Sequence, residues 1–194
     1  MNWQAYTVIW QLKASLHAGQ GKVGNLQLTR PYVTGRMLWG ALTERLARLQ
    51  AAEVGGPATE TEQYRQADAH NSLRFSYFFP ALREGERFVP QWPAEDESIF
   101  RYRFLDSYAS TALNYSHRRA LDGSLHEVEF IMPHTRPADS NDKSHPVYLM
   151  GVLFVQDGTP ISWEAAIARL QLGGERGYGW GWVELAQRPD SASD

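Results

Sequence analysis

The chain has 194 residues, no cysteine and a formal net charge of −3 at pH 7. The lack of cysteine excludes disulfides, thiolate metal ligands and a cysteine nucleophile. The negative charge argues against a protein that coats free nucleic acid through bulk electrostatics. No apolar run approaches the roughly 18 residues of a membrane span, and the N-terminus shows no secretory signal pattern. We therefore expect a cytoplasmic protein without a membrane partner, of a length that fits one domain.

The first part of the chain predicts a strand, a loop and a long helix. Residues 6–14 are rich in β-branched and aromatic side chains, which is typical of a strand, whereas 15–30 is polar and punctuated by glycine. Thr34 is the expected N-cap of a helix of about 14 to 18 residues that ends near Gly55. This helix carries apolar side chains at helical spacing: Leu38, Leu42, Leu46 and Leu49.

The rest of the chain predicts short strands, polar loops and one short helix. Pro80 is expected to close the first strand, and Ser162 to cap the helix. Strands are expected at 73–79, 125–132, 147–155 and 181–186, and the helix at 161–170. The other stretches are expected to be irregular (81–110 and 134–146), a polar helix or mobile insertion (58–71) and a disordered tail (189–194).

This order of elements places the chain in the α+β class. It matches a ferredoxin-like (RRM-like) β-α-β-β-α-β core with a large insertion after the first helix, at roughly 56–120. We expect residues 1–188 to form this single domain. Such a sheet is a recurrent platform for RNA, although the fold alone does not establish function.

The segment 173–183 is dense in glycine, with five glycines in nine residues, and also holds Arg176. Glycine is costly to order, so this density indicates positive φ or a close approach of the backbone to another group. Backbone N–H groups, a guanidinium and flat rings suit a ligand with phosphates and bases. A glycine-rich hairpin with an aromatic ladder fits equally well, because Tyr178, Trp180 and Trp182 alternate and are expected to share one strand face.

Four segments, in order along the chain, resemble the RAMP superfamily of CRISPR-associated (Cas) proteins. Ser-Leu-His-Ala-Gly at 15–19 is similar to that family's S-P-L-H-I-G turn, and P-Y-V-T-G-R-M-L-W-G-A-L at 31–42 resembles its P-Y-I-P-G-S-S-L-K-G-A-L-R helix entry. The segment 172–183 is similar to its L-G-G-x-R-x-x-G-x-G-x-V loop, and 116–133 resembles a stretch found in type III subunits. Departures occur at Thr34, Arg36, Met37 and Trp39, where the family has proline, two serines and lysine.

The resemblance implies which residues hold the backbone of a guide RNA (crRNA). The helix N-terminus offers free N–H groups to an anion. Arg36, which departs from the family's serine, is expected to compensate with a bidentate phosphate contact. The region 101–119 carries four arginines against one aspartate, which marks it as a surface for a polyanion. The expected RNA-binding residues are Lys22, Gly35, Arg36, Arg118, Arg119, Gly173, Gly174, Arg176, Gly177 and Gly179. Other CRISPR effector subunits are the expected protein partners, and no cofactor is needed.

Histidine supplies the only catalytic candidate. His17 lies in the turn after the first strand, where several metal-independent RNases of the superfamily keep a catalytic histidine that acts as general base. A turn histidine bonded to the backbone, or a simple RNA contact, is the alternative interpretation, because no Tyr or Lys partner is recognisable from spacing. The remaining histidines of 117–145 lack the spacing of a metal site. Asp122 is interpreted as a turn residue before Gly123.

The sequence therefore predicts an RNA-binding subunit of a type III-like CRISPR effector complex. The first alternative is an enzyme, a metal-independent endoribonuclease that processes the CRISPR repeat transcript with His17. The second is a ferredoxin-like domain, unrelated to CRISPR, whose glycine loop holds a nucleotide.

Overall fold

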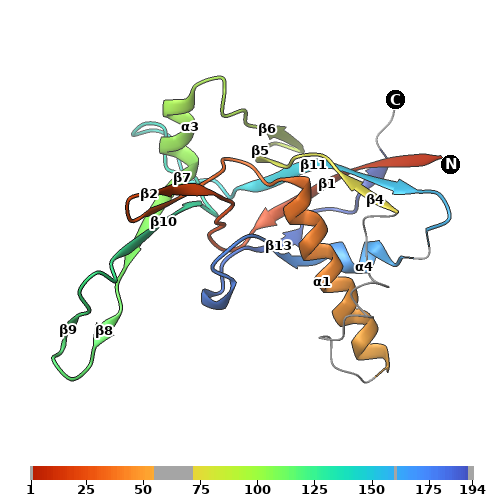
Figure 1. Ribbon diagram of the computed structural model, residues 1–194. Coiled ribbons are helices and arrows are strands. Elements are labelled where there is room, and N and C mark those ends of the chain that lie inside the picture. The colour runs from red at the N-terminus through yellow and green to blue at the C-terminus, as the bar shows by residue number, and fades with distance from the viewer. Residues whose placement is uncertain (1, 55–71, 160, 192–194) are drawn as a thin grey trace.

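The computed structural model describes residues 2–54, 72–159 and 161–191. The protein has a mixed α+β fold that is dominated by sheet and has few helices (Figure 1). Its helices in this described part are α1 (Gly35–Val54), α3 (Glu97–Phe104) and α4 (Trp163–Ile167), with a 3₁₀ turn, η1, at Arg176–Tyr178. None of them is long and apolar enough to span a membrane.

The described residues form a main sheet of eight strands. Its path is β12-β13-β1-β11-β5-β6, while β14 pairs with β1 and β4 pairs with β11. Every pairing in this sheet is antiparallel. The strands are β1 (Trp3–Leu12), β4 (Leu73–Phe75), β5 (Phe79–Glu84), β6 (Arg87–Pro90), β11 (Tyr148–Gln156), β12 (Arg169–Gln171), β13 (Trp182–Leu185) and β14 (Asp190–Ser191).

The core lies where α1 and α4 pack against β1 and β11. The leucines expected to face inward do so, since Leu38, Leu42 and Leu46 are buried and Leu49 packs against the same cluster. Trp10 stacks on Phe78 with ring centroids 4.9 Å apart, and its indole N–H donates to the Ile167 carbonyl over 2.7 Å. This bond satisfies the one polar group of a large apolar side chain, and so fixes α4 to the central strand.

A second sheet extends from the end of β1. It contains β2 (Gly19–Val23), β3 (Leu26–Thr29), β10 (His126–Ile131) and β7 (Leu105–Ser110), in that order. The expected loop at 15–30 is therefore wrong, because most of it forms the β2–β3 hairpin. Every residue of β2 is exposed, so the strand has no apolar alternation. It forms through its ladder with β3, which in turn pairs in parallel with β10.

The expected irregular stretch 81–110 is also wrong. Its first half forms the β5–β6 hairpin, and Pro80 lies inside β5 rather than ending a strand. Its second half contains α3, where the Asp96 carboxylate caps the helix by accepting the N–H of Ile99 over 3.0 Å. The prolines and mixed charges of this stretch indicated irregular structure, but pairing and packing with distant segments stabilise a hairpin and a helix there.

Other expected elements are confirmed, with shifted ends. The strands at 125–132 and 147–155 correspond to β10 and β11, and the last strand is β13. The helix after Thr34 is longer than expected, and α4 is shorter because β12 begins at Arg169. Ser162 stands at the N-cap without a side-chain hydrogen bond. In the expected tail, Asp190–Ser191 pairs with β1, whereas 58–71 and part of the expected insertion lie outside the described residues.

A hairpin arm, defined here as residues 111–125, projects away from the rest of the molecule (Figure 1). It contains β8 (Leu113–Asn114) and β9 (Arg119–Ala120), which pair only with each other. Leu113, Tyr115 and Leu121 are exposed on it. The arm therefore does not contribute to the core, and its side chains are available to other molecules.

Candidate nucleic-acid interface

A groove of about 1210 Å³ lies between the start of α1, strand β4 and the glycine-rich loop before β13. It brings together segments that are far apart in the sequence. Five of the ten expected RNA-binding residues line it. These are Gly35, Arg36, Gly173, Gly174 and Arg176.

The N-terminus of α1 is held at this groove by a short backbone pairing. Val33 exchanges hydrogen bonds with Phe78 over 2.8 and 2.9 Å, and the Thr34 hydroxyl accepts the N–H of Met37 over 3.4 Å. A Cβ at Gly35 would lie 2.9 Å from the Phe75 carbonyl oxygen, so glycine allows the helix to start against β4. The N–H group of Met37 is used by Thr34, whereas those of Gly35 and Arg36, the first two of α1, have no partner among the described residues. Both residues line the groove, and free N–H groups at a helix N-terminus suit an anion.

Four arginines line the groove, and no carboxylate of the described residues does: Arg30, Arg36, Arg74 and Arg176. Arg36 is exposed and forms no ion pair within the described part of the chain. Arg30 donates to the Gly19 carbonyl, and the guanidinium of Arg74 lies 5.2 Å from the centre of the Trp3 ring. Arg30 and Arg74 were not among the expected residues, because neither lies in a recognisable motif.

Arg176 has a partner outside the glycine-rich loop. It forms an ion pair with Glu44 on α1, and Glu44 also pairs with Arg48 over 2.6 Å. The Glu44 side chain is 16% exposed and that of Arg176 is 39% exposed. Glu44 lies 132 positions away in the sequence, so only the packing of α1 against the loop reveals the pair.

The glycines of the loop serve mainly to let backbones approach each other. Gly173 has φ +75°, and a Cβ there would lie 2.3 Å from the His17 carbonyl oxygen. The same carbonyl accepts the N–H of Gly174 over 2.9 Å. Gly177 and Gly179 belong to the η1 turn and its end and do not line the groove. The glycine density is therefore explained in part by the packing of this loop against the turn after β1.

The expected aromatic ladder is wrong. Tyr178 is 81% exposed in η1, whereas Trp180 packs edge-on against Phe130 with ring centroids 4.9 Å apart. Trp182 lies under the guanidinium of Arg169, 4.4 Å from its ring centre. The 3₁₀ turn breaks the alternation that a continuous strand would need.

His17 is buried at the edge of the groove, with 7% of its surface exposed. Its Nδ1 lies 2.7 Å from the Glu129 carbonyl oxygen, which only accepts, so Nδ1 donates and, in the neutral ring, Nε2 is left as an acceptor. A Cβ on Gly19 would lie 3.3 Å from Nε2, so this edge of the ring faces a residue that lines the groove. The backbone hydrogen bond agrees with the structural interpretation of this turn histidine.

The other expected residues lie apart from the groove. Lys22 is exposed on β2, and Arg118 and Arg119 are exposed on the arm. Arg118 has φ +51°, which places it in the turn of the hairpin. Asp122 is likewise exposed on the arm, next to Gly123 with φ +74°.

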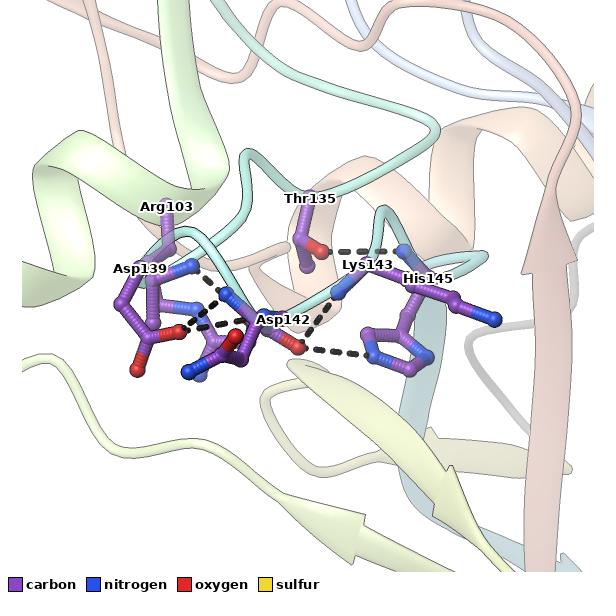
Figure 2. A network of polar contacts seen from close by, with 8 residues as sticks. Arg103, Thr135, Asp139, Asp142, Lys143 and His145 are labelled. Carbon is purple, nitrogen blue, oxygen red and sulfur yellow. Dashed lines mark hydrogen bonds and ion pairs between the residues drawn. The ribbon is translucent and has the colours of Figure 1, made fainter.

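A separate polar cluster in the loop 134–146 has a structural role (Figure 2). The Asp142 carboxylate accepts the backbone N–H groups of Ala138 and Lys143 over 2.7 and 2.8 Å, and it contacts Arg103 and His145 over 3.1 and 3.2 Å. These backbone bonds first, and then the two side chains, hold the pKa of Asp142 below its ordinary value. Because Arg103 belongs to α3, its ion pair with Asp142 ties the loop to that helix. No group of described residues is arranged to hold a metal ion.

No family model and no curated protein matches the chain, whereas solved structures resemble it in fold. A chain of a type III-B Cmr-beta complex bound to cognate target RNA, solved by cryo-EM, has a TM-score of 0.56 and 11% identity, over 95% of this chain and 96% of that one. A chain of the apo Cmr-beta complex has a TM-score of 0.58 and 11% identity, over 98% of each. At this identity the likeness establishes a shared fold.

Proposed function

We propose that the chain is an RNA-binding subunit of a type III-like CRISPR effector complex, and that its groove holds the backbone of the guide RNA. The proposal includes the assignment of the chain to the RAMP superfamily. The strand order β13-β1-β11-β5, with α1 following β1 and α4 following β11, supports a ferredoxin-like core for that assignment. The likeness in fold to chains of Cmr-beta complexes, one of them bound to target RNA, supports it independently.

The proposal rests on one observation, the arginine-lined groove at the start of α1. Four arginines and the start of a long helix line a cavity that no described carboxylate lines. Such a site suits a row of phosphates, because guanidiniums bind phosphate through charge-assisted hydrogen bonds. Because the net charge of the chain is −3, we expect RNA to be attracted to the groove and not to the surface as a whole.

Fluorescence anisotropy with a labelled single-stranded RNA of the CRISPR repeat tests this function. We expect Arg36→Ala and Arg176→Ala each to weaken binding by roughly 1–3 kcal/mol, because each removes a charge-assisted phosphate contact. Arg87→Ala is the matched control, since Arg87 is exposed on β6 away from the groove. Unchanged affinity in both groove variants at fixed salt would reject the proposed site.

The insertion and the 101–133 segment, which includes the arm, are proposed to contact other subunits or the guide–target duplex. The exposed Arg118 and Arg119 offer two positive charges at the far end of the molecule. Co-purification from the native host, followed by sequencing of the bound RNA, would identify the subunits and the guide together. Recovery of the chain alone, without RNA, would contradict the assignment.

The endoribonuclease remains the second candidate, because the acceptor Nε2 of His17 faces the rim of the groove. General-base catalysis also requires an acid and an oxyanion stabiliser at the same phosphate. Labelled repeat RNA incubated in EDTA distinguishes the two functions. Cleavage at one position that His17→Ala abolishes would establish the enzyme, whereas retention without cleavage supports the binding subunit.

A further inference from the structure

A row of four aromatic rings leads out of the arginine groove. Tyr77 lines the groove and stacks on Tyr32, with ring centroids 5.2 Å apart and planes 13° apart. Tyr32 contacts Phe79 at 5.5 Å, and Phe79 contacts Trp92 at 4.6 Å. The row therefore runs from the rim of the groove to Trp92, which follows β6.

The backbone places these rings on one face. Val33 and Phe78 pair with each other and are fully buried, so the residues next to them point the opposite way. Tyr32 flanks Val33, and Tyr77 and Phe79 flank Phe78. Gln91 donates its N–H to the Pro80 carbonyl over 2.7 Å, which brings Trp92 alongside Phe79.

The two ends of the row are open to other molecules. Tyr77 is 54% exposed and Trp92 is 45% exposed, while Tyr32 and Phe79 between them are half-buried. The inner rings support the outer ones, so little side-chain freedom is lost when a flat ligand stacks on them. Exposed aromatic faces beside a phosphate-binding groove are the arrangement used to hold single-stranded nucleic acid, since every base has a π-face.

We propose that this row stacks unpaired bases of a single-stranded RNA whose phosphates lie in the arginine groove. The inference rests on the proposed function and adds the form of the ligand. Charge complementarity selects this occupant: Arg36 and Arg74 line the same groove as Tyr77, so one strand meets guanidiniums and rings in succession. Stacking does not distinguish strongly between bases, so the site holds RNA with little sequence preference. A paired strand has its bases stacked inside a duplex and does not present them to these rings.

The test compares three labelled RNAs by anisotropy: a single strand, the same strand with abasic sites at its centre, and its duplex. Wild type should bind the intact single strand most tightly. Tyr77→Ala and Trp92→Ala should each weaken binding to it by about fivefold or more, because each removes a stacking surface. Tyr77→Phe keeps the ring and should bind like wild type. Ile99→Ala is the control, since Ile99 is an apolar residue of similar exposure, 57%, on α3.

The abasic strand distinguishes a loss of base stacking from other causes of weaker RNA binding. It retains its phosphates, so Arg36→Ala should weaken binding to the intact and abasic strands alike, whereas Tyr77→Ala should have no further effect on the abasic strand. Equal effects of Tyr77→Ala on both strands, or none on either, would overturn the stacking row while leaving the groove in place. Failure of wild type to bind any of the RNAs would overturn the proposed function as well.

Discussion

At the scale of single residues, Glu44 limits how much positive charge the groove presents. Its carboxylate is shared between Arg48 and Arg176 and is itself only 16% exposed. An RNA phosphate must compete with this carboxylate for Arg176. A partly exposed ion pair of this kind contributes about 0.2–1 kcal/mol, so the competition is modest and reversible.

Glu44→Gln should therefore strengthen RNA binding by roughly 1.5- to 5-fold, because Arg176 is released toward the groove and a nearby negative charge is removed. Titration of the labelled single strand at fixed salt measures the change. Glu86→Gln removes the same charge from the exposed β5–β6 turn and should leave affinity unchanged. Equal gains in both variants would show that net charge, and not the Arg176 pair, sets affinity.

Asp142 makes the stability of the loop 134–146, which it ties to α3, depend on pH. The backbone N–H groups of Ala138 and Lys143, with His145 and Arg103, hold its pKa below the ordinary value of 3.8. A carboxyl with a lowered folded pKa stabilises the protein above its unfolded pKa, and this contribution is lost as the pH falls below 3.8 toward the folded pKa.

Asp142→Asn should accordingly lower the urea midpoint at pH 7, and its difference from wild type should narrow in acid below pH 4. Urea titrations of both proteins at several pH values measure this. Asp122→Asn is the control, because Asp122 is exposed on the arm. A difference between wild type and Asp142→Asn that is the same at every pH would contradict the proposed role of the carboxylate.

At the scale of elements, the glycine loop and the turn after β1 form one unit. Gly174 donates to the His17 carbonyl, and Gly181 donates to the Ser15 carbonyl over 2.7 Å. These bonds hold the glycine loop, which lines the groove, against the turn that leads to Gly19, another lining residue. The close approach requires positions where a side chain has no room.

Gly173→Ala should destabilise the protein by about 1–3 kcal/mol or more, because alanine disfavours φ +75° and its Cβ would strike the His17 carbonyl. Gly177→Ala is the matched control, since a Cβ there meets nothing within 4 Å and its φ is not positive. Chemical denaturation gives both free energies of unfolding. Similar free energies of unfolding for the two variants would mean that the close approach of Gly173 to the His17 carbonyl does not require glycine.

At the scale of the whole molecule, the distribution of charge predicts a moderate dependence of RNA binding on salt. Single-stranded nucleic acid releases about 0.7 counterions per neutralised phosphate, so four arginines correspond to a log–log slope of about −3. Affinities measured across a salt series provide this slope. A value equivalent to more than about five phosphates would show that cations outside the groove, such as Arg118, Arg119 and Lys22, also bind the strand.

Much of the fold follows from local patterns in the sequence. Apolar strands such as β11 and the leucine-lined α1 were predictable, because the spacing of apolar residues within one segment indicates its buried face. The segments β2 and α3 were not, since their stability comes from partners: β2 is exposed throughout and relies on β3, and α3 is tied to Glu129 and Asp142 through Arg101 and Arg103.

The candidate site divides in the same way. Glycines and arginines in recognisable motifs identified Gly35, Arg36 and Arg176 as expected RNA contacts, a role that stays a prediction. Their convergence with Arg30 and Arg74 in one groove, the Glu44 pair, and the ring row beside it depend on contacts between distant segments. The sequence patterns identified residue types that can bind phosphate. Which of these residues lie together depends on long-range packing, because the core that positions them is formed by segments from the whole length of the chain.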